Sequence, residues 1–123
     1  MLSYQNNWED SGLYRIFTEK VSGRDILDSN LSIHGDSRFD DINYVINDFT
    51  RILEFEVSDL DIDKVATIDK VAAMSKRRLK IAIVATLESL LDWVHLYCER
   101  MEDSPYECEL FENYNDAYEW VTG

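Results

Sequence analysis

The stretch LKIAIVA, residues 79–85, is apolar at every position except Lys80. A strand with one wet face alternates polar and apolar side chains, whereas a strand covered on both faces is apolar almost throughout. Such strands are typical of the interior of a parallel sheet. The stretch therefore predicts a central strand, and it indicates that the rest of the chain supplies helices to pack on that sheet.

The segments around this strand alternate between predicted strands and predicted helices. A turn that ends at Gly12 joins the first two strands as a hairpin, and every strand from the second onward is followed by a helix. This order, β-β-α-β-α-β-α-β-α, predicts one α/β domain over residues 1–123 with a mainly parallel sheet and right-handed crossovers. The expected strands are 4–8, 13–21, 44–48, 79–85 and 106–111, and the expected helices are 22–35, 58–75, 87–102 and a short terminal one after Asn113 or Asn115.

Start signals are clearest in the first two helices. Ser22 and Asp25 form one predicted capping box, and Ser58 and Asp61 form the other. Apolar spacing then predicts the buried face of each helix. The expected buried residues are Ile26, Leu27 and Leu31 in the first helix, Ile62, Val65, Ile68 or Asp69, and Ala72 in the second, and Leu87, Leu90, Leu91, Val94, Cys98 and Met101 in the third.

Composition and charge limit the partners that the protein can have. The 123 residues carry 25 acidic and 12 basic side chains, which gives a net charge of −13. Such a surface repels phosphate groups, so nucleic acid and anionic membranes are not expected partners. The apolar runs are too short to insert across a membrane, and the first ten residues lack the pattern of a secretory leader. Two cysteines do not form a disulfide framework, so we expect reduced thiols and a cytoplasmic protein.

Three longer segments resemble a known group of proteins. They are GDSRFDDINYVINDFT (35–50), VATIDKVAAMSKRRLKIAIVA (65–85) and ELFENYNDAYEW (109–120). They resemble the Gly-Asp-x-Arg-Phe-Asp-Asp segment, the aliphatic fourth strand and the closing Ala-x-x-Trp of the SpoIIAA-like proteins. These are small, mostly uncharacterised bacterial proteins related to the anti-sigma-factor-antagonist (STAS) domain. The resemblance covers nearly the whole chain and implies a βα superhelical, SpoIIAA-like fold.

The predicted loop between Asp48 and Ser58 is a candidate functional site. In STAS domains that act as switches, an Asp-Ser-Ser-Gly motif opens the helix after this strand, and a partner kinase phosphorylates one of its serines. Ser58 falls where the second serine would be, but its surroundings read EVSDL, so the motif is broken and a helix N-cap explains the residue. Asp48 lies at the carboxyl end of a strand, where α/β folds bind ligands. Hydrogen bonds to the nearby backbone explain it as well and are favoured.

A basic cluster stands out in this acidic chain. The segment SKRRLK places Lys76, Arg77, Arg78 and Lys80 together at the predicted end of a helix. Compensation of the helix dipole accounts for part of the cluster. A contact with an anion or with an acidic partner stays open for the remainder.

Signatures of catalysis and of metal or cofactor binding are not found in the sequence. No serine or cysteine lies in a nucleophile elbow, and 4 scattered glycines do not make a phosphate-binding loop. Of the histidines and cysteines, only His95 and Cys98 have the spacing of metal ligands, and Cys98 is better explained as a buried thiol. We therefore expect no catalytic residue, no metal and no cofactor.

Helix 87–102 gives the strongest functional signal. Besides its core stripe it carries a second strip of Trp93, Leu96, Tyr97 and Arg100, and Trp, Tyr and Arg are the residue types enriched at binding hot spots. Three kinds of cover suit such a strip: a neighbouring element of the same chain, a second copy of the chain, or a small apolar ligand.

Two functions follow as hypotheses. The first is a non-enzymatic regulatory or protein-interaction module that forms a homodimer or docks a protein partner through this helix. The second is a binder of a small apolar, lipid-like ligand, because SpoIIAA-like proteins also resemble the CRAL-TRIO lipid-binding domains, whose helices part to admit a lipid tail. The side chains expected to line such a slot are Leu87, Leu91, Trp93, Leu96 and Tyr97.

Overall fold

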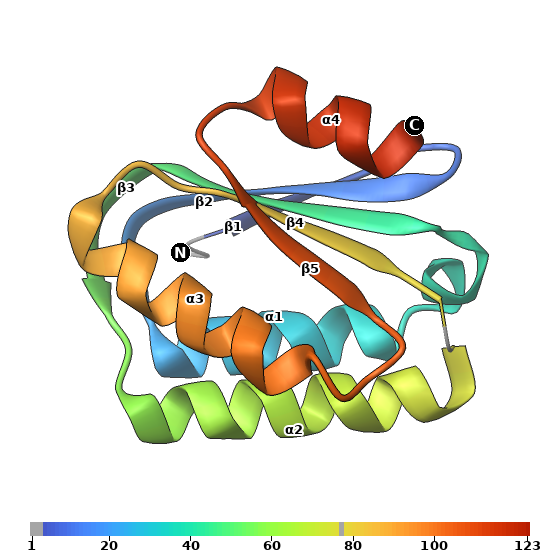
Figure 1. Ribbon diagram of the computed structural model, residues 1–123, viewed down its shortest axis with the longest axis horizontal. Coiled ribbons are helices and arrows are strands. Elements are labelled where there is room, and N and C mark those ends of the chain that lie inside the picture. The colour runs from blue at the N-terminus through green and yellow to red at the C-terminus, as the bar shows by residue number, and fades with distance from the viewer. Residues whose placement is uncertain (1–3, 77) are drawn as a thin grey trace.

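The computed structural model describes residues 4–76 and 78–123 and contains a five-stranded sheet with helices on both faces (Figure 1). The strands are β1 (Tyr4–Trp8), β2 (Gly12–Ser22), β3 (Tyr44–Glu56), β4 (Lys80–Val84) and β5 (Glu107–Phe111). The helices are α1 (Gly23–His34), α2 (Asp59–Lys76), α3 (Glu88–Met101) and α4 (Tyr114–Thr122), with a short 3-10 helix, η1 (Ser37–Asp41), after α1. The predicted α/β class and order of elements are therefore confirmed.

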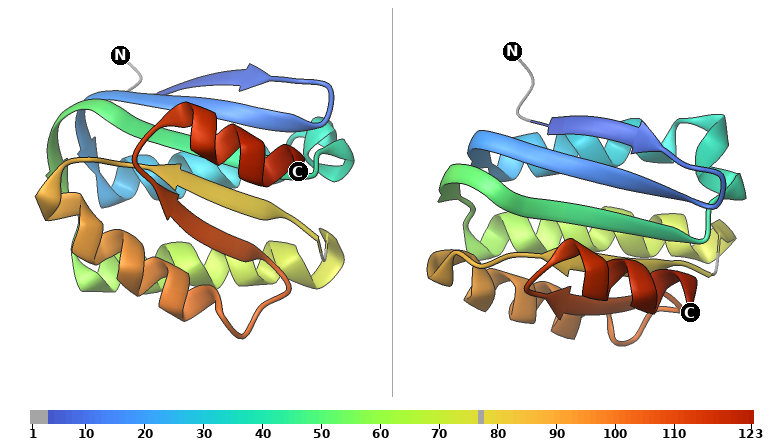
Figure 2. Two further views of the ribbon diagram at one scale, coloured as in Figure 1. Left: turned by 45° about the horizontal axis from the view of Figure 1, so that its top comes forward. Right: turned by 90° about the horizontal axis from the view of Figure 1, so that it is seen from above.

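The strands follow one another across the sheet in the order β1-β2-β3-β4-β5. β1 is antiparallel to β2, and every later pair is parallel. Figures 1 and 2 show α1, α2 and α3 on one face of the sheet and α4 on the other, where α4 lies over β4 and β5. No helix among the described residues is long and apolar enough to cross a membrane.

The apolar run in β4 separates two cores. Ile81 and Ile83 face the main core beneath α1, α2 and α3, and Ala82 and Val84 face the smaller core beneath α4. All four side chains are at most 5% exposed. Because both faces of this strand are covered, the strand has no polar side to show in the sequence.

Both predicted capping boxes are present. The N–H of Asp25 donates to Ser22 Oγ at 3.2 Å, and the N–H of Ser22 donates to Asp25 Oδ2 at 2.9 Å. Ser58 and Asp61 repeat this pair of bonds at 3.2 and 3.0 Å. These boxes fix the starts of α1 and α2. Asn113 caps α4 in the same way, with one bond of 2.9 Å from the N–H of the third helical residue.

The predicted end of β3 at Asp48 is wrong. The strand continues to Glu56, and its second half pairs with residues 18–22 of β2. Two register shifts interrupt this pairing, and at each of them β3 advances one residue more than β2. Bulges of this kind break the alternation of apolar and polar side chains that predicts a strand. Glu19, beside the second shift, has a φ of 61°, which is a left-handed conformation.

The buried faces of α1 and α3 are rotated from those that apolar spacing predicts. Leu31 is 50% exposed and Leu87 is 39% exposed, so both are wrong as core residues. Polar and aromatic side chains take the buried positions instead. The buried residues are Gly23, Ile26, Ser29, Asn30 and Ile33 in α1 and Leu90, Trp93, Val94, Tyr97 and Met101 in α3.

Candidate functional site

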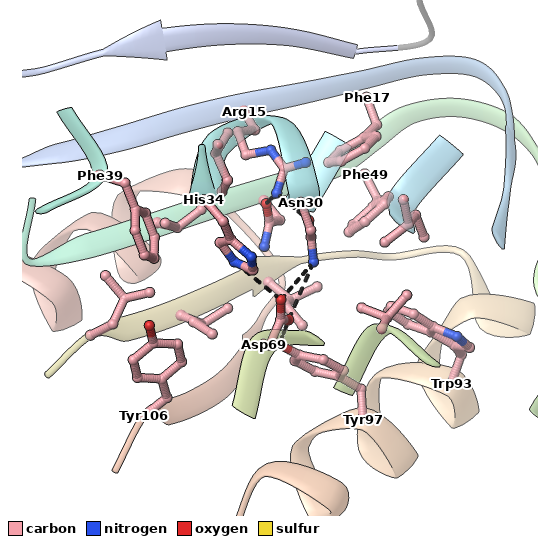
Figure 3. A pocket seen from close by; sticks show the side chains of 18 residues that line it. Arg15, Phe17, Asn30, His34, Phe39, Phe49, Asp69, Trp93, Tyr97 and Tyr106 are labelled. Atoms are coloured by element: carbon pink, nitrogen blue, oxygen red, sulfur yellow. Dashed lines mark hydrogen bonds and ion pairs between the residues drawn. The ribbon is translucent and has the colours of Figure 1, made fainter. Parts of the chain in front are cut away.

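A cavity lies in the main core, between the sheet and the layer of α1, α2 and α3 (Figure 3). Its volume is about 30 Å³, which is room for about one water molecule. The side chains that line it come from β2, β3, β4, α1, α2, α3 and η1 and from the loops just before β4 and β5. They form a polar cluster and an apolar wall.

Arg15 is the basic side chain of the cluster, and it is 2% exposed. Its Nη1 donates to Asn30 Oδ1 at 2.8 Å and to Asn47 Oδ1 at 3.2 Å, and its Nη2 donates to Ser29 Oγ. The guanidinium also lies over the ring of Phe17, 5.0 Å from the centroid. These contacts fix the orientation of the guanidinium between β2, β3 and α1.

Asp69 of α2 is the acidic side chain of the cluster, and it is 4% exposed. Its carboxyl group accepts hydrogen bonds from Asn30 Nδ2 at 3.1 and 3.2 Å and from the hydroxyl of Tyr97. His34 Nε2 lies 3.4 Å from Asp69 Oδ1. Figure 3 shows these side chains converging on Asp69. Because Asn30 bonds both charged residues, it joins Arg15 to Asp69.

Burial changes the acidity of three groups in this cluster. It raises the pKa of Asp69 from its ordinary 3.8 to about 6. Burial, together with the charge of Arg15, lowers the pKa of His34 from 6.5 to about 4. Burial also lowers the pKa of Arg15 to about 10, so the guanidinium keeps its proton at neutral pH. Shifted titratable groups gathered in a cavity are a mark of functional sites.

Aromatic side chains form the apolar wall. Phe17 and Phe49 stack with ring centroids 4.5 Å apart, and Trp93 packs edge-on against Phe49 at 6.5 Å. At the opposite end of the cavity, the ring of His34 lies 5.0 Å from that of Phe39. A mostly apolar wall with a few converging polar groups is the usual construction of a small-molecule site.

Three buried polar atoms of the lining residues have no hydrogen-bond partner in the part of the chain that the structure describes. They are Arg15 Nε, Trp93 Nε1 and the hydroxyl oxygen of Tyr106. Buried polar groups without partners are rare in folded proteins because leaving them unpaired is costly. These atoms belong to residues that line one cavity, and the Nε–H of Arg15 lies in the polar cluster, where a bound molecule can supply the missing acceptor.

The strip predicted on α3 divides between this cavity and the surface. Trp93 and Tyr97 are 7% and 4% exposed and line the cavity, so other elements of the same chain cover them, which is the first of the three kinds of cover that the sequence left open. Leu96 is half-buried, and Arg100 forms an ion pair with Asp63 of α2 at 2.9 Å. Of the side chains expected to line a ligand slot, the two aromatic ones do so and the leucines do not.

Asp48 and Ser58 do not line the cavity. Asp48 Oδ2 accepts a hydrogen bond of 2.6 Å from the hydroxyl of Tyr14, which packs on the core beneath α4. Its Oδ1 accepts from the N–H of Thr50 at 2.9 Å and from the Thr50 hydroxyl at 2.6 Å. Ser58 is exposed and caps α2. Both residues therefore have local structural partners.

The predicted basic cluster is spread over the two faces of the sheet. Lys76 Nζ donates to a backbone carbonyl of η1 at 3.3 Å, and Lys80 Nζ donates to a backbone carbonyl of α4 at 3.0 Å. Arg78 is exposed, and Arg77 lies outside the described residues. The described members do not come together as a single anion-binding patch, because the backbone directs Lys76 and Lys80 to opposite sides.

The histidines and cysteines are dispersed. Cys98 and Cys108 are free thiols whose mutual interaction lowers the pKa of Cys98 and, together with burial, raises that of Cys108. His95 is exposed, whereas His34 lies in the cavity. Within residues 4–76 and 78–123, no three His, Cys, Asp or Glu side chains are grouped closely enough to hold a metal ion.

Sequence reasoning missed Arg15, Asn30 and Asp69 as a set. Each is a polar residue at a position that the strand or helix period places on a buried face. Arg15, for example, lies between Leu13 and Phe17, which are both fully buried on the same side of β2. That exception to the pattern was a usable signal. It shows that a residue faces the core, but not which other residues it meets there.

A solved structure confirms the fold. The chain is similar to the crystal structure of an uncharacterized protein from the DUF3478 family with a SpoIIAA-like fold, from Shewanella loihica PV-4. The TM-score is 0.59 and the sequence identity 18%, and the match covers 97% of this chain and 93% of that chain. No family model and no curated protein matches the sequence. The chain has a SpoIIAA-like fold, as the three sequence segments predict.

Proposed function

We propose that the protein is a non-enzymatic binding module that holds one small, mainly apolar molecule between the sheet and the layer of α1, α2 and α3. The cavity carries this proposal, because it joins an aromatic wall to a buried polar cluster with unpartnered hydrogen-bonding atoms. Small-molecule sites combine these two features, the wall for affinity and the polar groups for orientation. Burying such groups costs stability when no ligand is bound, which favours a role in binding over a role in packing.

A ligand larger than water requires the walls to part, because the closed cavity measures about 30 Å³. The accessible end lies at His34, whose side chain is 17% exposed, while most other lining residues are buried. There Phe39 of η1 packs against His34. Lys76, at the end of α2, places its Nζ over the ring of Phe39, 5.1 Å from the ring centroid. Separation of η1 from the end of α2 opens the cavity at this point with little change to the sheet.

Native mass spectrometry of protein purified without additives tests this function first. A retained small molecule adds its mass to that of the chain. Thermal unfolding in the presence of octanoate or 1-octanol is the second measurement, because any molecule that binds only the folded form raises Tm. An unaltered chain mass, together with an unchanged Tm in both probes, would contradict the proposal.

Two valine variants locate the binding site. Val45→Ile adds a methylene group to the wall of the cavity, and Val84→Ile adds the same group to the core beneath α4. We expect Val45→Ile to lose the retained mass and the rise in Tm, and Val84→Ile to keep both. If both variants lose the retained mass and the rise in Tm equally, the cause is a general loss of stability, and the cavity is not the binding site.

A second candidate function, association with a second copy or another protein, is favoured by the outer face of α2. Leu60, Val71 and Met74 recur there at helical spacing and are 63%, 61% and 77% exposed. Leu31 of α1 borders the groove between α1 and α2. Exposed apolar patches often mark interaction sites. Sedimentation equilibrium should then give a dimer mass that Val71→Asp reduces to one chain; a single-chain mass for the wild type would contradict self-association.

A further inference from the structure

The positive charge of Arg15 has no acidic group in contact with it. The oxygen atoms that accept from its guanidinium belong to Ser29, Asn30 and Asn47, and all three are neutral. No carboxylate of the described residues forms an ion pair with it. Asp69 is joined to it only through the amide of Asn30. The direct hydrogen-bond partners of this basic group are therefore all neutral, and the negative charge of Asp69 acts on it only across Asn30.

Two features show that this site is oriented but incomplete. The Oγ of Ser29 donates its own proton to the carbonyl of Ile26 at 2.9 Å, which leaves its lone pairs to accept from Arg15. The Nε–H of Arg15 has no acceptor among the residues that the structure describes. A buried charge of this kind is strongly unfavourable unless an opposite charge and further hydrogen bonds compensate for it.

We propose that Arg15 is the anion-binding residue of the cavity and that its ligand is an amphipathic monocarboxylate, with an acid group on the guanidinium and an apolar body along the wall of Phe17 and Phe49. This inference rests on the proposed function, because it names the class of ligand for the same cavity. A planar carboxylate matches the fork of N–H groups that a guanidinium presents. The apolar wall accounts for the rest of the molecule.

The other titratable groups around the cavity set the charge of the ligand. Asp69 is occupied by hydrogen bonds from Asn30 and Tyr97, so it does not need the ligand as a partner. The remaining titratable side chains of the lining, His34, Tyr97 and Tyr106, are neutral at pH 7. Arg15 is thus the positive charge of the lining, and Asp69, beyond the amide of Asn30, is its negative charge. A single carboxylate can pair with the guanidinium directly, whereas a doubly charged phosphate would leave an excess negative charge beside Asp69.

Octanoate and 1-octanol test this inference on the wild-type protein, because they share an eight-carbon chain and differ in the charge of the head group. We expect calorimetry to show octanoate binding at least about tenfold more tightly than 1-octanol. Equal affinities, or tighter binding of 1-octanol, would overturn the inference and leave the proposed function standing. Binding of neither probe would overturn both.

A pair of arginine variants assigns the preference to one residue. Arg15→Met removes the charge and keeps a long unbranched side chain, whereas Arg38→Met makes the same change at a surface guanidinium stacked 4.4 Å above the ring of Trp8. Arg15→Met should bind the two probes alike, and Arg38→Met should keep the preference for octanoate. A folded Arg15→Met protein that still prefers octanoate would overturn the assignment. Circular dichroism checks that each variant is folded. If Arg15→Met is unfolded, the wild-type comparison and the variant Arg15→Lys test the assignment instead. Arg15→Lys keeps the positive charge and should keep the preference for octanoate.

Discussion

Asp69→Asn and His34→Gln should change the pH dependence of stability in opposite directions. In the folded protein the pKa of Asp69 is about 6 and that of His34 about 4, whereas their ordinary values are 3.8 and 6.5. Folding thus nearly swaps the two pKa values. Folded and unfolded chains therefore bind almost the same number of protons on these two groups at each pH. Equal proton numbers mean that the pair, which lies 3.4 Å apart, adds almost no pH dependence to the wild type.

Each variant removes one half of this balance. In His34→Gln, Asp69 keeps a folded pKa above its unfolded value, so its stabilising contribution is full below pH 3.8 and is lost as the pH rises through about 6. In Asp69→Asn, His34 keeps a folded pKa below its unfolded value, so its contribution is full above pH 6.5 and is lost as the pH falls toward about 4. A difference of about two pKa units corresponds to about 3 kcal/mol in either case.

Urea unfolding between about pH 4 and about pH 7 measures these slopes against the wild type, which supplies the background of all other titratable groups. Over that range, the free energy of unfolding relative to the wild type should fall by about 3 kcal/mol in His34→Gln and rise by about 3 kcal/mol in Asp69→Asn. Met74→Gln, at an exposed site of the same helix as Asp69, changes no titratable group and should run parallel to the wild type. Curves for both cavity variants that run parallel to the wild type would refute the reasoning.

Three further predictions test local structure by urea unfolding. Ser58→Ala should lower the free energy of unfolding by about 1 kcal/mol, because the cap bond of α2 is lost; an unchanged value would contradict the capping role. Glu19→Gly should raise it by up to about 1 kcal/mol, since glycine adopts the φ of 61° without strain, and a decrease would speak against strain there. Gly12→Ala should lower the free energy of unfolding by about 1–3 kcal/mol, because the new Cβ would lie 2.2 Å from the ring of Tyr44. Gly35→Ala should be near neutral, because its Cβ would lie 3.6 Å from the nearest atom. Similar urea midpoints for the two variants would contradict the packing argument.

The order of elements could be predicted because its signals are local in the sequence. The buried run of β4 and the boxes at Ser22 and Ser58 each depend on residues within a few positions of one another. The second half of β3 could not be predicted in this way. Its buried and half-buried apolar residues, Phe49, Ile52 and Phe55, recur every third position, because the bulges shift the register against β2. A period of three fits neither a strand nor a helix, so apolar spacing does not predict a strand there.

The cavity was harder to predict because its polar residues are distant in the sequence and each breaks an otherwise apolar pattern. On α1, Leu27 and Leu31 offered a regular stripe, and the stripe that the protein buries includes Ser29 and Asn30. Apolar spacing alone predicts that the stripe with Leu27 and Leu31 is the buried one. The second is buried because Arg15 in β2 supplies hydrogen bonds to both polar side chains, and that pairing depends on tertiary structure.

The polar cluster has a consequence for stability that argues for a ligand. A core of the same shape filled with apolar side chains is often as stable as one with buried charges, or more stable. Packing alone therefore does not account for Arg15, Asn30 and Asp69. Their hydrogen bonds fix α1 and α2 against the sheet, but the direct partners of Arg15 are neutral, and the charge of Asp69 acts on it only across Asn30. If a ligand supplies the opposite charge, binding relieves the unfavourable term that the unliganded protein carries, so ligand affinity and folding stability rise together. The same bonds that make the core less favourable on its own would then be the ones that select the ligand.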